Sequence, residues 1–183
     1  MQGRSIIILL MVTVCSVTMF FSCRNNFKEV QNIGILSSEP LTVAENINTK
    51  YTDTSGLLSV LKSPKMLNYS NRDFAYYEFP DGIDLVLYDE NDDETHIIAD
   101  YAIVYDETDL IDLRGNVVLD THKRDTLFAD QLFYDQKREW LFTNNAVRFR
   151  TQDQLIDGHG FDSDREFTKA RVLEVSGVVF LNE

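Results

Sequence analysis

Apolar and polar side chains alternate at every second residue through the second half of the chain, and this period limits the fold more than any other feature. In the segment 110–119, Ile111 and Leu113 fall on one face of an extended chain, while Asp112 and Arg114 fall on the other. Such a row is typical of a β-strand with one buried and one solvated face. The sequence that follows the N-terminal segment has no sustained helical period, so it predicts an all-β fold.

Polar turn sequences separate these alternating segments. A parallel pair of strands needs a crossover of about a dozen residues or more, usually a helix, and no connection here has a helical pattern. We therefore expect an antiparallel sheet whose register is well specified. The expected strands are 83–88, 97–105, 110–119, 126–134, 140–150 and 171–181.

Part of this pattern repeats along the chain. Ala99-Asp100 and Tyr105-Asp106 recur as Ala129-Asp130 and Tyr134-Asp135, roughly thirty residues later. One interpretation is a stack of long hairpins, each adding two strands to a sheet that folds over on itself around an apolar interior. The other is the self-similarity that any series of hairpins shows. The sequence leaves both interpretations open.

The first residues have a different composition from the rest. Arg4 precedes an almost wholly apolar run over 6–21, and a small residue stands directly before Cys23. This order predicts a lipoprotein signal peptide over 1–22, cleaved so that Cys23 carries the lipid. Phe20 replaces the usual leucine of that motif, and an uncleaved signal-anchor helix is the alternative. Both interpretations place the rest of the chain outside the cytoplasm.

The remainder divides into a tether and one domain. Residues 23–47 are polar without a sustained period and are typical of a lipidated linker, whereas 48–183 carry the alternation. Both cysteines, Cys15 and Cys23, precede the domain, which therefore has no disulfide, no thiolate metal site and no cysteine nucleophile. Its stability must come from a hydrophobic core.

Charge and spacing exclude several classes of function. The chain has 17 Lys and Arg against 30 Asp and Glu, without the basic stripe that a phosphate backbone requires, so we exclude nucleic acid. The acidic run 89–94 lacks the spacing of a calcium-binding loop and is expected to be a solvated hairpin tip. His96, His122 and His159 are too far apart to form a local ligand pair. We expect no metal, no cofactor, no catalytic residue and no enzymatic activity.

Several short motifs occur in an order that resembles one known family. They are Tyr51-Thr52-Asp53-Thr54-Ser55-Gly56, Tyr77-Glu78-Phe79-Pro80-Asp81-Gly82, Ala99-Asp100-Tyr101-Ala102, Gly115-Asn116-Val117 and Ile156-Asp157-Gly158-His159-Gly160-Phe161. In this order and spacing they resemble the LptC family, the periplasmic component of the lipopolysaccharide-export (Lpt) ABC transporter system, which is kin to the bridge protein LptA. The chain is similar to the short, lipoprotein-like members rather than to those with an N-terminal spanning helix.

The resemblance implies an elongated, twisted antiparallel β-jelly roll, shaped like a folded trough, whose interior takes lipopolysaccharide acyl chains. It also implies a non-enzymatic carrier or scaffold, lipid-anchored at the periplasmic face of the inner membrane. Such a carrier accepts lipopolysaccharide from the inner-membrane ABC transporter. It passes the lipid to an LptA-like bridge protein by edge-to-edge contact between jelly rolls.

Two sets of candidate residues follow. The inward rows of the alternation supply the lipid-binding candidates: Ile83, Leu85, Ile111, Leu113, Val117, Leu119, Leu141, Val147, Phe149, Leu173, Val175 and Val179. For this set, a closed hydrophobic core is the alternative interpretation. The candidates for strand edges that meet the transporter and the bridge protein are Tyr51, Leu61, Val172, Val175, Val178 and Phe180.

The alternative function comes from a different class, a structural envelope lipoprotein. Its closed β-sandwich would bind protein partners and no lipid. A carrier needs an apolar groove that can open, whereas a structural module is packed shut. The state of the interior is therefore the observation that separates the two functions.

Overall fold

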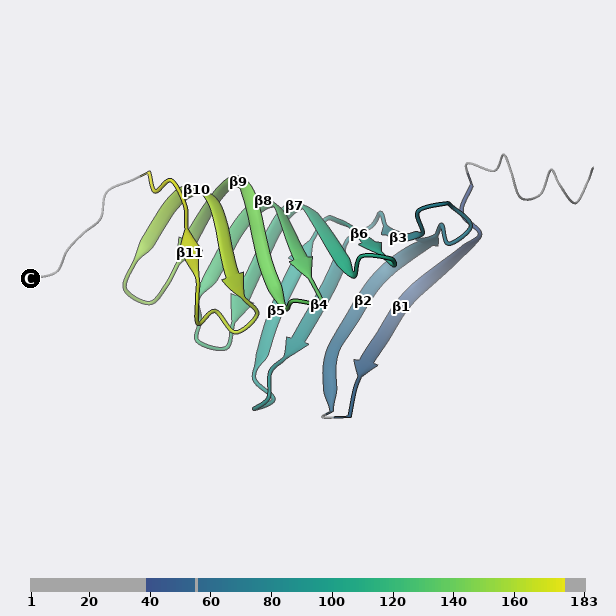
Figure 1. Ribbon diagram of the computed structural model, residues 1–183, viewed down its shortest axis with the longest axis horizontal. Coiled ribbons are helices and arrows are strands. Elements are labelled where there is room, and N and C mark those ends of the chain that lie inside the picture. The colour runs from purple at the N-terminus through teal and green to yellow at the C-terminus, as the bar shows by residue number, and fades with distance from the viewer. Residues whose placement is uncertain (1–38, 55, 177–183) are drawn as a thin grey trace, which may run out of the picture. The chain divides into compact units, whose positions relative to one another are not determined.

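The computed structural model describes residues 39–54 and 56–176, which belong to one compact unit. In this part of the chain every strand pairs antiparallel with its neighbours in a single sheet, and no helix is formed (Figure 1). The expected all-β, antiparallel fold is confirmed. The strands are β1 (Thr42–Thr52), β2 (Leu57–Asn68), β3 (Tyr76–Phe79), β4 (Ile83–Tyr88), β5 (Glu94–Ala99), β6 (Tyr101–Tyr105), β7 (Leu110–Thr121), β8 (Thr126–Asp135), β9 (Trp140–Arg150), β10 (Leu155–Asp164) and β11 (Arg171–Val172).

The sheet folds over on itself because β2 and β7 each take part in two layers. The second half of β7 pairs with β5, where Leu119 lies opposite Ile97, and its first half pairs with β6, where Leu113 lies opposite Ala102. In the same way, the first half of β2 pairs with β4 and its last residues pair with β3. β1 lies along β2, and β8 to β11 continue the sheet beyond β7 (Figure 1). This is the folded trough that the resemblance implies.

The long strands β7 to β10 change register near their middles. Pairing between β7 and β8 shifts between Arg114 and Val117, and pairing between β9 and β10 shifts between His159 and Phe161. Gly115 lies at the first shift with a φ of +74°, a conformation that glycine adopts without steric cost. Because such bulges bend a strand and increase its twist, the two halves of each strand can enter different layers.

Apolar side chains fill the space between the two layers. Leu113, Leu119 and Leu141 are fully buried there, and Phe149 packs against Phe161 with ring centroids 5.6 Å apart. Fully burying one such side chain contributes about 1.5–3 kcal/mol. The buried cluster receives side chains from β2 through β10, so the packing of this interior holds both layers together.

The outer face of β7 is less solvated than the alternation predicts. Asp112 is 2% exposed, because Arg114 Nη2 donates to its Oδ2 at 2.5 Å and Gln131 Nε2 donates to its Oδ1 at 2.7 Å. The expectation that this face is solvated is therefore wrong at Asp112. A charge-assisted hydrogen bond of this kind is stronger than a neutral one, and the network ties β7 to β8 on the outside of the sheet.

The prediction of one continuous strand over 97–105 is wrong, because the structure divides this segment into β5 and β6 at Asp100. The buried positions change phase there, from the odd-numbered Ile97 to the even-numbered Ala102. The backbone N–H of Asp100 donates to the Gly115 carbonyl oxygen at 3.0 Å. A change of phase turns the other face of the chain toward the interior, so β5 and β6 can pair with different halves of β7.

Four strands, β1, β2, β3 and β10, have no counterpart among the expected strands. β1 begins at Thr42, inside the segment 23–47 expected to be a tether, and most of its side chains are exposed, so it carries little apolar signal. β2 contains Pro64, and β10 contains Gly158 and Gly160, residue types that are uncommon inside strands. Gly160 has a φ of +86° and lies at the register shift of β10 between His159 and Phe161.

The expected final strand, 171–181, is shorter over the described residues. β11 ends at Val172, and an isolated bridge then joins Val175 to Gly158. Gly158 permits this close approach, because a Cβ atom there would lie 2.4 Å from Val172 Cγ1. The rest of the expected strand, from 177 onward, lies outside the described residues.

Candidate functional site

The interior between the two layers is the candidate lipid site. Most of the lipid-binding candidates are buried in its single apolar cluster: Ile83, Leu85, Ile111, Leu113, Val117, Leu119, Leu141, Val147 and Phe149. Leu173 and Val175 do not reach it, because they follow the end of β11 and are 42% and 56% exposed. The last lipid-binding candidate, Val179, lies outside the described residues, as do the partner-edge candidates Val178 and Phe180. Rows from several strands therefore converge on one apolar volume.

The described partner-edge candidates lie in different environments. Tyr51 on β1 and Val175 after β11 are exposed. Leu61 is 3% exposed in the core, and Val172 packs against the core, so neither side chain is presented freely at an edge. Among the described strands β1 pairs only with β2, which leaves its other edge open.

A small cavity lies where the ends of strands from the two layers face each other. Its volume is about 140 Å³, and we call it the seam cavity. The residues lining it include Leu61, Leu85, Val104, Ile111, Tyr134 and Arg165. A cavity of about 150 Å³ can accept a benzene-sized ligand. The seam cavity is therefore large enough for a short apolar segment.

Arg165 closes one side of the seam cavity. Its Nη1 lies 2.9 Å from Glu139 Oε1, and its backbone N–H donates to the Glu139 carbonyl oxygen at 3.0 Å. The Arg165 side chain is only 10% exposed, and its Nε has no hydrogen-bond partner among the described residues. Nothing in the sequence pattern pointed to this residue, because it follows a strand, β10, that the alternation does not predict.

Tyr134 belongs to the same lining as Arg165. It is 4% exposed, and burial raises the pKa of its hydroxyl to about 12, although the positive charge of Arg165 acts in the opposite direction. The hydroxyl is therefore neutral at physiological pH. The neutral hydroxyl cannot balance the charge of the guanidinium, and the carboxylate of Glu139 does so instead.

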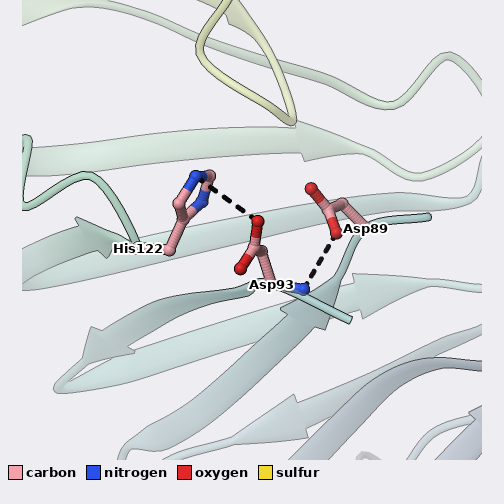
Figure 2. A group of neighbouring side chains, drawn as sticks. All are labelled: Asp89, Asp93 and His122. Carbon is pink, nitrogen blue, oxygen red and sulfur yellow. Dashed lines mark hydrogen bonds and ion pairs between the residues drawn. The ribbon is translucent and has the colours of Figure 1, made fainter. Parts of the chain in front are cut away.

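Figure 2 shows Asp89, Asp93 and His122, whose ligand atoms lie within 4.8 Å of one another. Asp89 Oδ1 accepts hydrogen bonds from the backbone N–H groups of Asn91 at 2.8 Å and Asp93 at 2.9 Å. His122 Nε2 lies 3.5 Å from Asp93 Oδ2. Burial alone would raise the pKa of Asp89, but the two backbone hydrogen bonds and His122 lower it overall. These contacts brace the turn between β4 and β5, so the cluster has a structural explanation.

An antiparallel sheet folded around an apolar interior, with an open strand edge at β1, defines a β-jelly roll of the folded-trough type. The sequence matches, over residues 8–179, the family described as lipopolysaccharide-assembly, LptC-related. The chain therefore belongs to the LptC family. No curated protein matches the sequence at a significant level.

Membership of this family implies a role in lipopolysaccharide transport, in association with lipopolysaccharide and the Lpt system. Family members are non-enzymatic transport components at the periplasmic side of the inner membrane. The described residues contain no apolar helix of membrane-spanning length. The expected family and fold are confirmed, while the lipid anchor and the lining residues stay predictions.

The raised pKa of Tyr134 predicts a pH dependence of stability. Its folded-state pKa of about 12 lies above the ordinary value of 10.0, so the stability associated with the neutral hydroxyl is complete below pH 10 and is lost as the pH rises toward 12. Over this interval the free energy of unfolding should fall by about 2 kcal/mol more in the wild type than in Tyr134→Phe. Urea unfolding at a series of pH values measures the difference. Identical pH profiles would contradict the assignment.

Proposed function

We propose that this protein is a carrier that accepts lipopolysaccharide from the inner-membrane Lpt ABC transporter and passes it to an LptA-like periplasmic bridge protein. The observation that carries the proposal is the apolar interior to which strands from β2 through β10 contribute. Acyl chains entering such an interior gain about 25 cal/mol for each Å² of apolar surface removed from water. Family membership supports the same substrate class.

The charge of the protein indicates how the lipid would lie. The chain has a formal net charge of −13, which repels the phosphate groups of a lipopolysaccharide headgroup. The acyl chains must therefore supply the affinity while the headgroup stays in water. This arrangement needs an interior that chains can enter from the side, between the two layers.

A structural envelope lipoprotein with a closed sandwich is the second candidate function. The observation that favours it is the tight closure of the interior, where Leu113, Leu119 and Leu141 have no exposed surface. Under the carrier proposal the layers separate to admit acyl chains, beginning where the seam cavity already leaves space. Under the structural alternative they stay closed, and the lipid never contacts the buried rows.

Site-specific photocrosslinking distinguishes the two functions. During ATP-driven transport, lipopolysaccharide should crosslink to a photoreactive residue at Val117 or Val147, because both positions are buried in the interior. Arg148, the residue after Val147, is the matched control, since its side chain is 58% exposed and pairs with Asp157 on the outside of the sheet. Equal crosslinking at Val147 and Arg148, or none at either, would favour the structural alternative.

We also propose that Cys23, which lies outside the described residues, carries a lipid anchor after cleavage of residues 1–22. Wild-type protein should incorporate a radioactive fatty acid, and Cys23→Ser should incorporate none and keep its signal peptide. Labelling in cells followed by N-terminal sequencing measures both. A wild-type protein that takes up no label and begins at Met1 would instead support an uncleaved membrane helix.

Two docking edges complete the proposal. β1, which has an open edge and an exposed Tyr51, would face the transporter, and the segment after β10 would face the bridge protein. In the order of strands in the sheet these edges are far apart. An incoming strand would gain backbone hydrogen bonds at either edge, which is the usual source of affinity in strand addition.

Gly158→Ala tests the second edge, because a Cβ atom would lie 2.4 Å from Val172 Cγ1 and 2.6 Å from the Leu173 carbonyl oxygen. The segment after β10 must then move, and overpacking of this kind costs about 1–3 kcal/mol of stability. Pull-down should show weaker capture of the bridge protein and unchanged capture of the transporter. Ala146→Ser, an exposed change on β9, is the control. Equal loss of both partners, in a variant that circular dichroism shows to be folded, would count against separate edges.

A further inference from the structure

The seam cavity combines aliphatic side chains with a buried cation. Six of the twelve residues that line it are aliphatic, among them Leu61, Leu85 and Val104, and the lining also includes the buried side chain of Arg165. One guanidinium nitrogen pairs with Glu139, and the side chain also interacts with the Tyr134 hydroxyl, while the buried Nε–H makes no hydrogen bond within the described residues. A buried donor without an acceptor is unfavourable, so a ligand oxygen placed here would remove that cost.

The charges around Arg165 limit what that oxygen can belong to. A second hollow of about 500 Å³ adjoins the seam cavity and shares Leu58, Glu139 and Arg165 with it. Arg165 is the only Lys or Arg in its described lining. The other charged residues there are six carboxylates: Asp53, Asp89, Glu90, Asp92, Glu139 and Glu166. A free carboxylate or phosphate would enter a negative field there, whereas a neutral carbonyl oxygen would not.

We propose that the seam cavity is a subsite for the first carbons of an acyl chain held in ester or amide linkage, with Arg165 Nε–H donating to the carbonyl oxygen. The aliphatic walls take the methylenes next to the carbonyl, and the neutral hydroxyl of Tyr134 lies in the same lining. This inference rests on the proposed carrier function and deepens it. It assigns to Arg165 the positioning of the chain at its polar end.

The proposal is tested with two photoreactive probes on the full chain in phosphatidylcholine nanodiscs. One probe is a monododecanoyl glycerol ester with a terminal diazirine, and the other is the free fatty acid with the same diazirine. Mass spectrometry locates the label and gives the probe concentration for half-maximal labelling. The ester should label the cavity walls at a lower concentration than the acid.

Variants assign the effect to the Arg165 nitrogen. Arg165→Lys keeps a cation near Glu139 but lacks Nε–H, and should raise the half-maximal ester concentration at least about tenfold, the lower end for one hydrogen bond to a charged group. Arg138→Met is the matched control, because its side chain is 82% exposed, and should leave labelling unchanged. Val104→Phe fills the cavity and should abolish labelling by both probes. Glu139→Gln reduces the negative field and should improve labelling by the free acid.

Three outcomes would overturn the inference. Equal ester labelling of wild type and Arg165→Lys would show that Arg165 does not bind the carbonyl oxygen. Labelling by the acid at a lower concentration than by the ester would contradict the preference for a neutral carbonyl. Absence of label from the cavity walls would show that the cavity is not a subsite. None of these outcomes affects crosslinking of lipopolysaccharide at Val117, so the carrier proposal can stand when this inference fails. Conversely, if lipopolysaccharide does not crosslink at Val117 while the probes still label the cavity walls, the carrier proposal fails and the subsite remains.

Discussion

The whole fold depends on apolar packing between its two layers, which share strands such as β7. A strand that serves two layers must bend, and a bend breaks the backbone ladder at that point. Here the breaks occur at Gly115 and at the register shift between His159 and Phe161, while the side chains on either side of each break pack into one shared core. Burial in that core stabilises the bent strands, so the interior and the bends require each other.

This dependence explains why the interior is both the main source of stability and the candidate site. A lipid chain cannot enter while Leu113 and Leu119 pack without exposed surface, so the proposed carrier function requires a small separation of the layers. Packing of the apolar side chains against one another is then replaced by packing against the acyl chain, and for this reason the exchange need not cost much free energy. The ion pair of Arg165 with Glu139 lies beside the seam cavity.

The sequence predicted some parts of this fold well and others poorly. β4, β8 and β9 lie within a residue of their expected bounds, because polar turn sequences flank each of them. β1 was hidden by its exposed side chains, and the division of 97–105 was hidden because both halves are apolar. Nine inward candidates are buried in the core cluster, but Leu173 and Val175 are exposed, since regular pairing with β10 ends at Val172 and continues only as an isolated bridge at Val175.

The sequence by itself determined the all-β class, the antiparallel pairing, nine of the twenty residues of the core cluster and the family. These are local properties, because a two-residue period assigns each side chain to a face without reference to the rest of the chain. Only the tertiary structure decided that the faces meet across a bent sheet, that Asp112 is covered on the outer side, and that Arg165 reaches Glu139 beside an apolar cavity. Those contacts join residues from different strands and turns, and their distances depend on how each strand bends.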